Sequence, residues 1–480
     1  MSLEPGGAAG ATLREAREDA RRQARTLSAA GVMLAGVGVA LAAMALVVAL
    51  DYRFAQDPHR VVKILLGAAA FAGILLRPRI GLLLLAAATP FLPWMPGIRL
   101  PGVNVLNVLL ISIFATWGLS RVLRRQPLFR PARLGWVLGA LFVVAALSVL
   151  RGAAIPSGFE YRAADRLIDL LRSTVTVTVY FVALSMTRGE RERRTLAWAV
   201  VAGLLLESVV TIALGRNGPG GRATGSIGQS NELGAFLGIF TVVAAALLGG
   251  VRHLLARAVL AATVVAGAFA TLLSLSRAAI LGLALGLLFV SFRTSRGLAL
   301  ITVAVLLTAP FWTPDYVRER LTSTEIEVQD ADGTMLEASA QARVDTWRAI
   351  ATLVSEHPLD GVGFGGLYDV LPETGLEMNL DVKGSSHNSF LRFLGEMGVL
   401  GLALFVVLLW RCWALARDAT RAATSRFDRQ LGIGLGAATL VFACACAFGD
   451  RFFPIVIAGN FWILCAIADD IVLESRGRGA

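Results

Sequence analysis

The sequence predicts an all-α, polytopic membrane protein, a bundle of about 14 transmembrane helices with one long, partly helical external loop. Of its 480 residues, 56% are hydrophobic and only 16% are charged, whereas soluble domains carry roughly a quarter charged residues. The apolar residues gather into runs of about 20, the length that a helix needs to cross the hydrocarbon core. These observations exclude a soluble enzyme, a disordered scaffold and a disulfide-stapled secreted domain.

Apolar runs of spanning length recur along the chain with polar connections between them. The expected number of helices is 12 to 14, roughly, because the shorter runs can pair as re-entrant segments. The predicted spans cover residues 29–50, 61–76, 80–95, 104–120, 133–150, 170–186, 195–214, 231–249, 257–274, 277–292, 297–312, 389–410, 432–448 and 453–468.

The net charge of +11 is concentrated on one side of the predicted membrane. Arginine-rich segments such as residues 14–25, 121–133 and 411–429 occupy alternate connections. Short arginine-rich loops face the cytoplasm, so both termini are predicted to be cytoplasmic. The basic surplus is therefore a topology signal that requires no nucleic-acid partner. A charged leader precedes a first apolar run of full spanning length, which argues against a cleaved signal peptide.

The spans divide the chain into four predicted parts. They are a cytoplasmic leader (1–28), transmembrane helices 1 to 11 (29–312), an external loop or cap (313–388), and the last three transmembrane helices with a cytoplasmic tail (389–480). Within the cap, the stretch from about residue 336 to 355 has helical periodicity, and Pro358 ends it. Arg343 lies one turn before Trp347 on the apolar face. Either its stem packs on the indole, or its charge turns inward over a cavity at membrane level.

The first of four polar elements on the external side is the glycine-rich loop 215–230, directly before a predicted span. Glycines allow close backbone approach, the following helix offers its N-terminus, and Arg216 and Arg222 offer fixed charge. This combination suits an anionic head group such as a phosphate. The alternative is a flexible turn with interfacial arginines.

The other three polar elements reach the same side. Arg277 ends the tight break 274–277 and either extends to lipid head groups or faces a polar cavity. His387 precedes the first span after the cap, and is either incidental or able to take a proton from a sugar hydroxyl. In that role, Asn388 and the adjacent serines would fix the histidine tautomer. Asp450 and Arg451 lie in the last external connection, where a structural ion pair is the alternative.

Other polar features are assigned structural roles. The glycine-rich run 361–366 is predicted to be a turn rather than a nucleotide loop, and Asp330 with Asp332 is a weak metal signal. The four cysteines lack metal or redox spacing. Four charged residues within apolar runs are predicted to face the bundle interior, namely Glu207, Arg172, Arg392 and Glu396.

Taken together, four segments resemble the O-antigen ligase and O-antigen polymerase superfamily. They are RATGSIGQSNELGAF (222–236), SLSRAAILG (274–282), ARVDTWRAI followed by HPLDGVGFGG (342–366), and SHNSFLRFLGEMGVLG (386–401). The resemblance implies a GT-C type membrane glycosyltransferase of the bacterial inner membrane, with its cap and site facing the periplasm. It also implies a glycan donor carried on undecaprenyl diphosphate, an acceptor glycan or lipid, and no metal or cofactor.

Carried over residue by residue, the resemblance implies that Arg222 and Arg277 hold the donor diphosphate and that His387 acts on the acceptor hydroxyl. Arg343 would lie near the sugar or phosphate, and Asp450 would be a polar partner near the histidine. The chain departs from the family where Gln-Ser-Asn stands at 229–231 in place of an Asn-Pro-Asn-like run. The choice between Arg216 and Arg222 therefore stays open.

The chemistry of this hypothesis is direct, inverting displacement at the anomeric carbon. A lipid diphosphate is already an activated leaving group, so transfer requires charge stabilisation by arginines and a base on the acceptor. Whether the acceptor is a lipid-linked repeat, a lipid core or a protein stays open. The competing class is a transporter or flippase of an anionic or lipid-linked substrate, although the sequence lacks the inverted repeats that such carriers often show.

Overall fold

The computed structural model describes residues 77–94, 105–123, 125–154, 159–322, 325–327, 334–336, 338–374 and 385–479. The predicted leader and the predicted spans 29–50 and 61–76 lie outside these residues. The chain divides into two compact units, one formed by Met1–Leu84 with Leu100–Gln126 and the other by Leu85–Arg99 with Pro127–Ala480. In the first unit, the predicted span 104–120 corresponds to helix α4 (Val105–Leu123).

Nine helices of the described chain are long and apolar enough to cross a membrane, and each coincides with a predicted span. They are α5 (Gly135–Ala154), α6 (Ala163–Met186), α7 (Glu190–Leu214), α8 (Ser230–Leu248), α9 (Leu254–Leu273), α10 (Arg277–Thr294), α15 (Ser389–Ala422), α16 (Arg426–Ala447) and α17 (Ile455–Gly479). Two further predicted spans are shorter apolar helices, α3 (Pro78–Ala88) with η1 (Thr89–Trp94), and α11 (Arg296–Trp312). The prediction of a helical, polytopic membrane bundle is confirmed.

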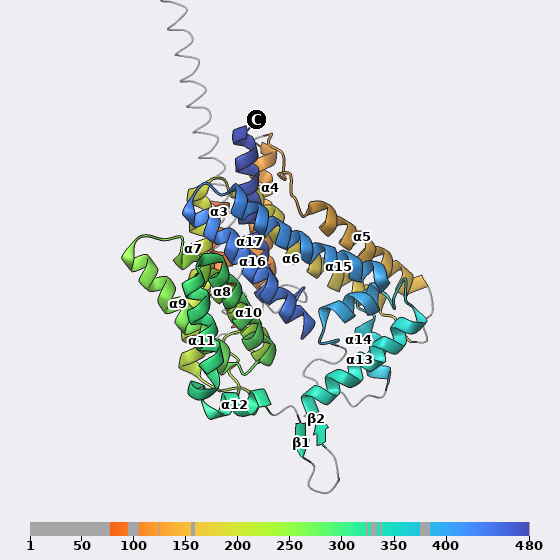
Figure 1. Ribbon diagram of the computed structural model, residues 1–480. Helices are drawn as coiled ribbons and strands as arrows, with labels where there is room; N and C mark the ends of the chain where they lie inside the picture. Colours follow the sequence, from red (N-terminus) through yellow and green to blue (C-terminus); the bar gives the residue numbers. More distant parts are fainter. Residues whose placement is uncertain are drawn as a thin grey trace, which may run out of the picture. The chain divides into compact units, whose positions relative to one another are not determined.

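Helices α8, α16 and α17 form the centre of the larger unit, where most of their residues are buried, whereas only about a third of the residues of α9 and α10 are buried. Helix α8 packs against both α10 and α16 (Figure 1). Small residues permit this close approach. A Cβ on Gly234 would meet Ala279 Cβ at 2.8 Å and Ser274 Oγ at 2.7 Å. The start of α8 is therefore fitted closely to the break before α10.

The segment between α11 and α15 contains α12 (Asp315–Thr322), β1 (Glu325–Glu327), β2 (Thr334–Leu336), α13 (Ala338–Glu356), α14 (Leu367–Val370) and η3 (Leu371–Thr374). The predicted cap helix corresponds to α13. The two strands pair antiparallel, an addition to the predicted all-α fold. Each strand has only three residues, too short for the alternation of apolar and polar side chains to reveal it.

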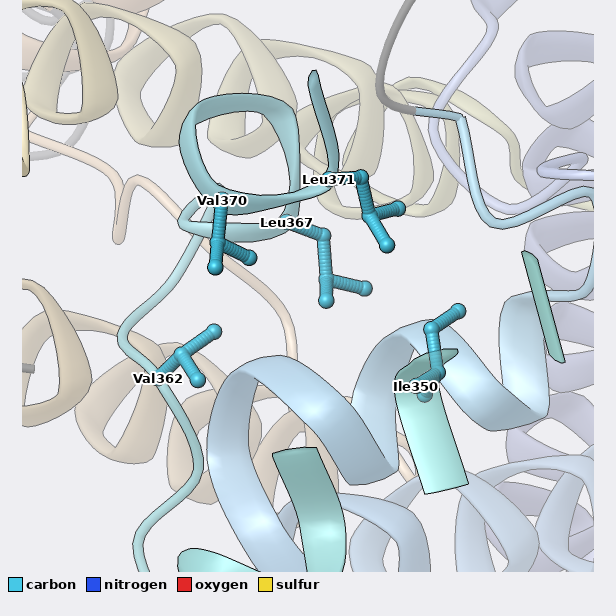
Figure 2. Close-up of a cluster of buried hydrophobic side chains, with 5 residues drawn as sticks. All are labelled: Ile350, Val362, Leu367, Val370 and Leu371. Carbon is cyan, nitrogen blue, oxygen red and sulfur yellow. The ribbon is translucent and has the colours of Figure 1, made fainter. Parts of the chain in front are cut away.

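A small apolar core joins α13 to α14 and to the glycine-rich run before it. It consists of Ile350, Val362, Leu367, Val370 and Leu371, whose side chains face one another in Figure 2. Both α13 and α14 lie beside the first part of α15 (Figure 1). This core fixes the cap to the helix that begins directly after His387.

Helix α15 is interrupted at Gly398, where φ is +64°. The interruption frees carbonyl groups that a continuous helix would bond internally. Val362 N–H donates to the Gly395 carbonyl at 2.9 Å, and Gly363 N–H donates to the Glu396 carbonyl at 3.1 Å. The run 361–366 is therefore a turn, as predicted, and its amides complete the broken helix.

Three of the four charged residues predicted to face the interior do so. Glu207, Arg392 and Glu396 are 0%, 8% and 1% exposed. The prediction for Arg172 is wrong, because 65% of its side chain is exposed and it pairs at 3.4 Å with Asp169. These two residues lie three apart on an exposed face of α6, where an arginine needs no buried partner.

Candidate functional site

The loop 215–230 and the break 274–277 are joined by Arg222. Its Nε donates to the Ser274 carbonyl at 3.1 Å, and its Nη2 donates to Asn231 Oδ1 at 2.7 Å. The amide of Ala223 adds a backbone bond of 2.9 Å to the Leu273 carbonyl. The half-buried guanidinium of Arg222 thus lies between the end of α9 and the start of α8.

The start of α8 is also bonded to the connection between α16 and α17. Gln229 caps the helix by accepting from the Glu232 amide at 2.7 Å. The Glu232 carboxylate accepts from Arg451 Nη1 at 2.9 Å, and the Arg451 side chain is only 7% exposed. The Gln229 side chain thus satisfies a donor that the helix N-terminus leaves open. The first turn of α8 therefore contacts the last polar connection as well as the loop before it.

Arg277 is the first residue of α10 and is half-buried. The carbonyl of its neighbour Ala278 accepts from Cys444 Sγ at 3.7 Å, near the end of α16. This contact places Arg277 at the same end of the bundle as the connection between α16 and α17.

The segment before α15 is held by that same connection. Ser385 Oγ and Ser386 Oγ donate to the two oxygens of the Asp450 carboxylate at 2.7 and 2.6 Å. Ser389 Oγ donates to the Gly449 carbonyl at 2.9 Å. Asp450 is therefore fixed by the serines that immediately precede His387. The hydroxyls of these serines position this carboxylate, and their predicted effect on the His387 tautomer stays a prediction.

Asn388 follows His387 and bonds to the first turn of the next helix. Its Oδ1 accepts from the amides of Phe390 and Leu391 at 2.9 and 3.2 Å, so it caps α15. The neighbouring His387 is half-buried and has φ of +49°. Such a backbone is uncommon for residues other than glycine, and it persists only where surrounding contacts enforce it. The bonds of Ser385, Ser386 and Asn388 provide those contacts.

Only three non-glycine residues of the described chain have positive φ, and two lie at this end of the bundle. They are His387 and Leu275, which precede α15 and α10. Left-handed backbone in residues with a side chain clusters at functional sites, since it costs about 1–3 kcal/mol each. The two helix starts that carry His387 and Arg277 are therefore shaped in the same way.

Arg343 lies on α13 and is half-buried. One turn later, Trp347 Nε1 donates to the Ser386 carbonyl at 3.0 Å. The helix that carries Arg343 is thus anchored beside His387.

Arg216 is placed differently from Arg222. It is exposed, its Nε donates to the Gly221 carbonyl, and its guanidinium lies 4.1 Å from the ring centroid of Tyr316 on α12. A cation over an aromatic ring is stabilised without an ionic partner. Of the two arginines in this loop, Arg222 bonds to the break before α10, whereas Arg216 bonds within the loop itself.

Asp450 and Arg451 bond to different segments, Asp450 to the serines before His387 and Arg451 to the start of α8. They do not form the structural ion pair that the sequence left as an alternative. Together they bring four polar elements, predicted separately from the sequence, to one end of the bundle.

The charge of Asp450 reaches further into the cap. At Tyr368 on α14, the guanidinium of Arg392 lowers the pKa of the hydroxyl, but burial and the carboxylates of Asp450 and Glu396 raise it more. The net result is a raised pKa, so the Tyr368 hydroxyl stays protonated and can donate a hydrogen bond.

The sequence analysis did not identify Glu232, and it did not predict that the two serines before His387 bond to Asp450. A polar residue in the first turn of a helix is a common capping signal, so Glu232 could have been noted as a charge at that helix start. In the described residues, no group of three or more His, Cys, Asp or Glu side chains is arranged to hold a metal ion. Asp330 and Asp332 lie outside those residues.

Comparison with protein families matches residues 262–406 to the family described as O-antigen ligase. This match confirms the resemblance predicted from the sequence. It contains three of the four segments that carried the prediction, and the segment 222–236 precedes it. The matched family is an enzyme family of membrane proteins whose substrates are lipid-linked glycans. No curated protein matches the chain significantly.

Proposed function

We propose that the protein transfers a glycan from undecaprenyl diphosphate to an acceptor hydroxyl in the periplasm, as a metal-independent, inverting glycosyltransferase of surface polysaccharide assembly. The observation that carries the proposal is the double hydrogen bond of Asp450 to the serines before His387, at the end of the bundle where Arg222 and Arg277 also lie. The family match over residues 262–406 supports the same substrate class.

The donor side is assigned to Arg222 and Arg277. The contacts of Arg222 with the Ser274 carbonyl and with Asn231 Oδ1 orient its guanidinium between the break before α10 and the start of α8. A diphosphate gains negative charge as the glycosidic bond breaks, and arginine guanidinium groups stabilise that charge in bidentate geometry. The N-termini of α8 and α10 add partial positive charge at the same end. Arg343 is assigned to the sugar or the adjacent phosphate.

The acceptor side is assigned to His387. A neutral imidazole takes the proton of the attacking hydroxyl, and the resulting imidazolium is stabilised by the carboxylate of Asp450. The carbon–oxygen bond to the acceptor forms as the bond to the diphosphate breaks, so the anomeric configuration inverts. The lipid diphosphate leaves with the electron pair of the broken bond.

The proposed topology is that of an inner-membrane protein of about 14 spans with both termini in the cytoplasm. The arginine-rich connections lie at the ends of α6, α8, α10 and α15, opposite to the end that carries His387. The site then opens to the periplasm, where lipid-linked glycans are presented.

The test is transfer by the purified protein in nanodiscs, given an undecaprenyl diphosphate glycan and candidate acceptors in the presence of a chelator. Mass spectrometry of the product identifies the acceptor as a lipid-linked repeat, a lipid core or a peptide. Magnetic resonance of the new linkage reports its anomeric configuration. Retention of the donor's configuration would refute direct displacement, and loss of activity with the chelator would refute metal independence.

A transporter or flippase is the alternative that this experiment separates. Movement of the donor across the bilayer of proteoliposomes without any covalent product would replace the transferase proposal. A covalent product that forms in detergent, where no compartment exists, would exclude transport as the sole activity.

A further inference from the structure

Two basic cavities lie at the end of the bundle opposite to His387. The larger, of about 740 Å³, lies between the end of α10 and the turn from α15 to α16, and its lining includes Arg293, Arg426 and Arg429. The smaller, of about 520 Å³, shares Arg426 and adds Arg194 and Arg252. Neither lining contains a carboxylate within the described chain. The cavities therefore favour an anion.

Arg194 of the smaller cavity pairs with Glu190 at 2.6 Å, but the first turn of α16 explains why Arg426 and Arg429 have no carboxylate partner in the described chain. Asp428 is 1% exposed and turns inward, where it accepts from Arg193 Nη2 at 2.6 Å. Arg426 and Arg429, on either side of it, are exposed. In the part of the chain that the structure describes, neither they nor Arg293 form an ion pair. Asp428 therefore pairs inside the bundle, and Arg426 and Arg429 remain at its surface.

Exposed apolar side chains lie beside the cavities, where the acyl chains of a bound lipid would pack. Phe292 lines the larger cavity and is 67% exposed. Leu254 and Leu255 follow His253 of the smaller cavity and are 80% and 67% exposed. Trp198 also lines the smaller cavity, and tryptophan is enriched at the membrane interface. A free phosphate would use the arginines but would leave these apolar side chains without a partner.

We infer that the two cavities bind the head group of an anionic phospholipid, with its phosphate on Arg426 and its acyl chains along the exposed apolar side chains. Arginine binds phosphate oxygens in a planar, bidentate arrangement. Basic pockets between helices at the cytoplasmic surface bind such head groups in other membrane proteins. Because Arg426 lines both cavities, a lipid with two phosphates has a site for each. This site is independent of the proposed glycan transfer.

The experiment is native mass spectrometry of the full-length protein released from nanodiscs that contain cardiolipin, phosphatidylglycerol or phosphatidylcholine. We expect retained adducts of the two anionic lipids and not of the zwitterionic lipid. Arg426→Gln should lower the bound fraction about five-fold, and Arg426→Gln with Arg293→Gln should lower it further, since each basic residue near the surface contributes to lipid binding. Arg188→Gln, an exposed arginine that lines neither cavity, is the matched control and should retain the adducts.

A second arm separates a lipid head group from a free anion. Thermal unfolding of the delipidated protein is followed with added cardiolipin or with inorganic phosphate at equal phosphate concentration. We expect cardiolipin to raise the unfolding temperature of the wild type, but not of Arg426→Gln, and phosphate to have little effect on either. Equal stabilisation by phosphate would overturn the lipid assignment. Equal retention of phosphatidylcholine, or unchanged adducts in Arg426→Gln, would overturn the site.

Discussion

Arg193 and Arg222 show how differently the two ends of the bundle hold an arginine. Arg193 is 3% exposed in its side chain and donates to three carboxylates. These carboxylates belong to Asp428, Asp470 and Glu474, at 2.6, 2.7 and 2.6 Å. Arg222 is half-buried and donates to neutral oxygens of Ser274 and Asn231.

Under the proposed function, the contrast separates a structural clamp at Arg193 from a donor-binding arginine at Arg222. A buried guanidinium surrounded by carboxylates is neutralised, and its main effect is to hold together the elements that supply its partners. A guanidinium held by carbonyl and amide oxygens has its orientation fixed by those contacts. The difference predicts that substitutions at the Arg193 end act on stability and that substitutions at the His387 end act on transfer.

The largest expected effect is on activity at His387. His387→Ala should lower the rate of glycan transfer by about 10²- to 10⁴-fold, since the general base is removed. The unfolding temperature should stay within a few degrees of the wild type. The control is His357→Gln. His357 lies in the cap and contacts Arg151 of α5, and this variant should keep most of the activity. Full activity of His387→Ala would remove the histidine from the mechanism.

The next effect is on stability at the opposite end. Arg193→Ala should lower the free energy of unfolding by about 3–5 kcal/mol, because it leaves buried carboxylates without their cation. Thermal unfolding in detergent measures it. Arg348→Ala removes an arginine of which 72% of the side chain is exposed and which also pairs with an aspartate, so it should cost less than about 1 kcal/mol. Similar losses in the two variants would contradict the idea of a clamp at Arg193.

Arginine-to-lysine substitutions sharpen the choice between the two arginines of the loop 215–230. Arg222→Lys keeps the charge but loses the planar fork, so the KM for the lipid diphosphate donor should rise about ten-fold. Arg277→Lys should behave in the same way. Arg216→Lys should change KM less, since Arg216 stacks on Tyr316. A larger effect at Arg216 than at Arg222 would reverse the assignment of the donor site.

A smaller effect on the transfer rate is expected from the serine that positions Asp450. Ser386→Ala removes one hydrogen bond to its carboxylate, which should lower the transfer rate by about five-fold, in line with roughly 1 kcal/mol for such a bond. The pH–rate profile should shift, which a purely structural loss would not cause. Ser386→Thr retains the hydroxyl and should restore the profile. An unchanged profile in Ser386→Ala would remove Asp450 from the positioning of the base.

The smallest expected effect is at the cap. Partial burial raises the pKa of Asp360, but the hydrogen bond and charge of Arg151 lower it more, so the net shift is downward. Stability from this pair is present above the usual carboxylate pKa, near 4, and is lost as the pH falls through the lower folded value. Because 46% of the Asp360 side chain is exposed, screening limits the effect to a few tenths of a kcal/mol. Asp360→Asn should reduce the difference in unfolding temperature between pH 7 and pH 3, and an increased difference would contradict the pairing.

Much of the fold follows from local pattern. Nine of the predicted spans are helices long and apolar enough to cross a membrane, because an apolar run of that length forms a helix there, and α13 was visible from its periodicity. The sequence also placed Arg222, Arg277, His387 and Asp450 on one side, because helix ends alternate between the two sides.

The contacts between those helix ends could not be predicted. The bond between Glu232 and Arg451 joins residues 219 positions apart, and nothing local selects either as the partner of the other. The serines before His387 were noticed, but their bonds to Asp450 depend on how α15 and α16 pack. The exposure of Arg172 was misjudged because an apolar run does not reveal which face of its first turns meets the other helices.

The interruption of α15 at Gly398 has a mechanical consequence. Since amides of the cap complete the hydrogen bonding of the short helical stub between residues 389 and 397, the stub and the cap form one rigid piece. The imidazole at the start of the stub therefore keeps its position relative to the cap.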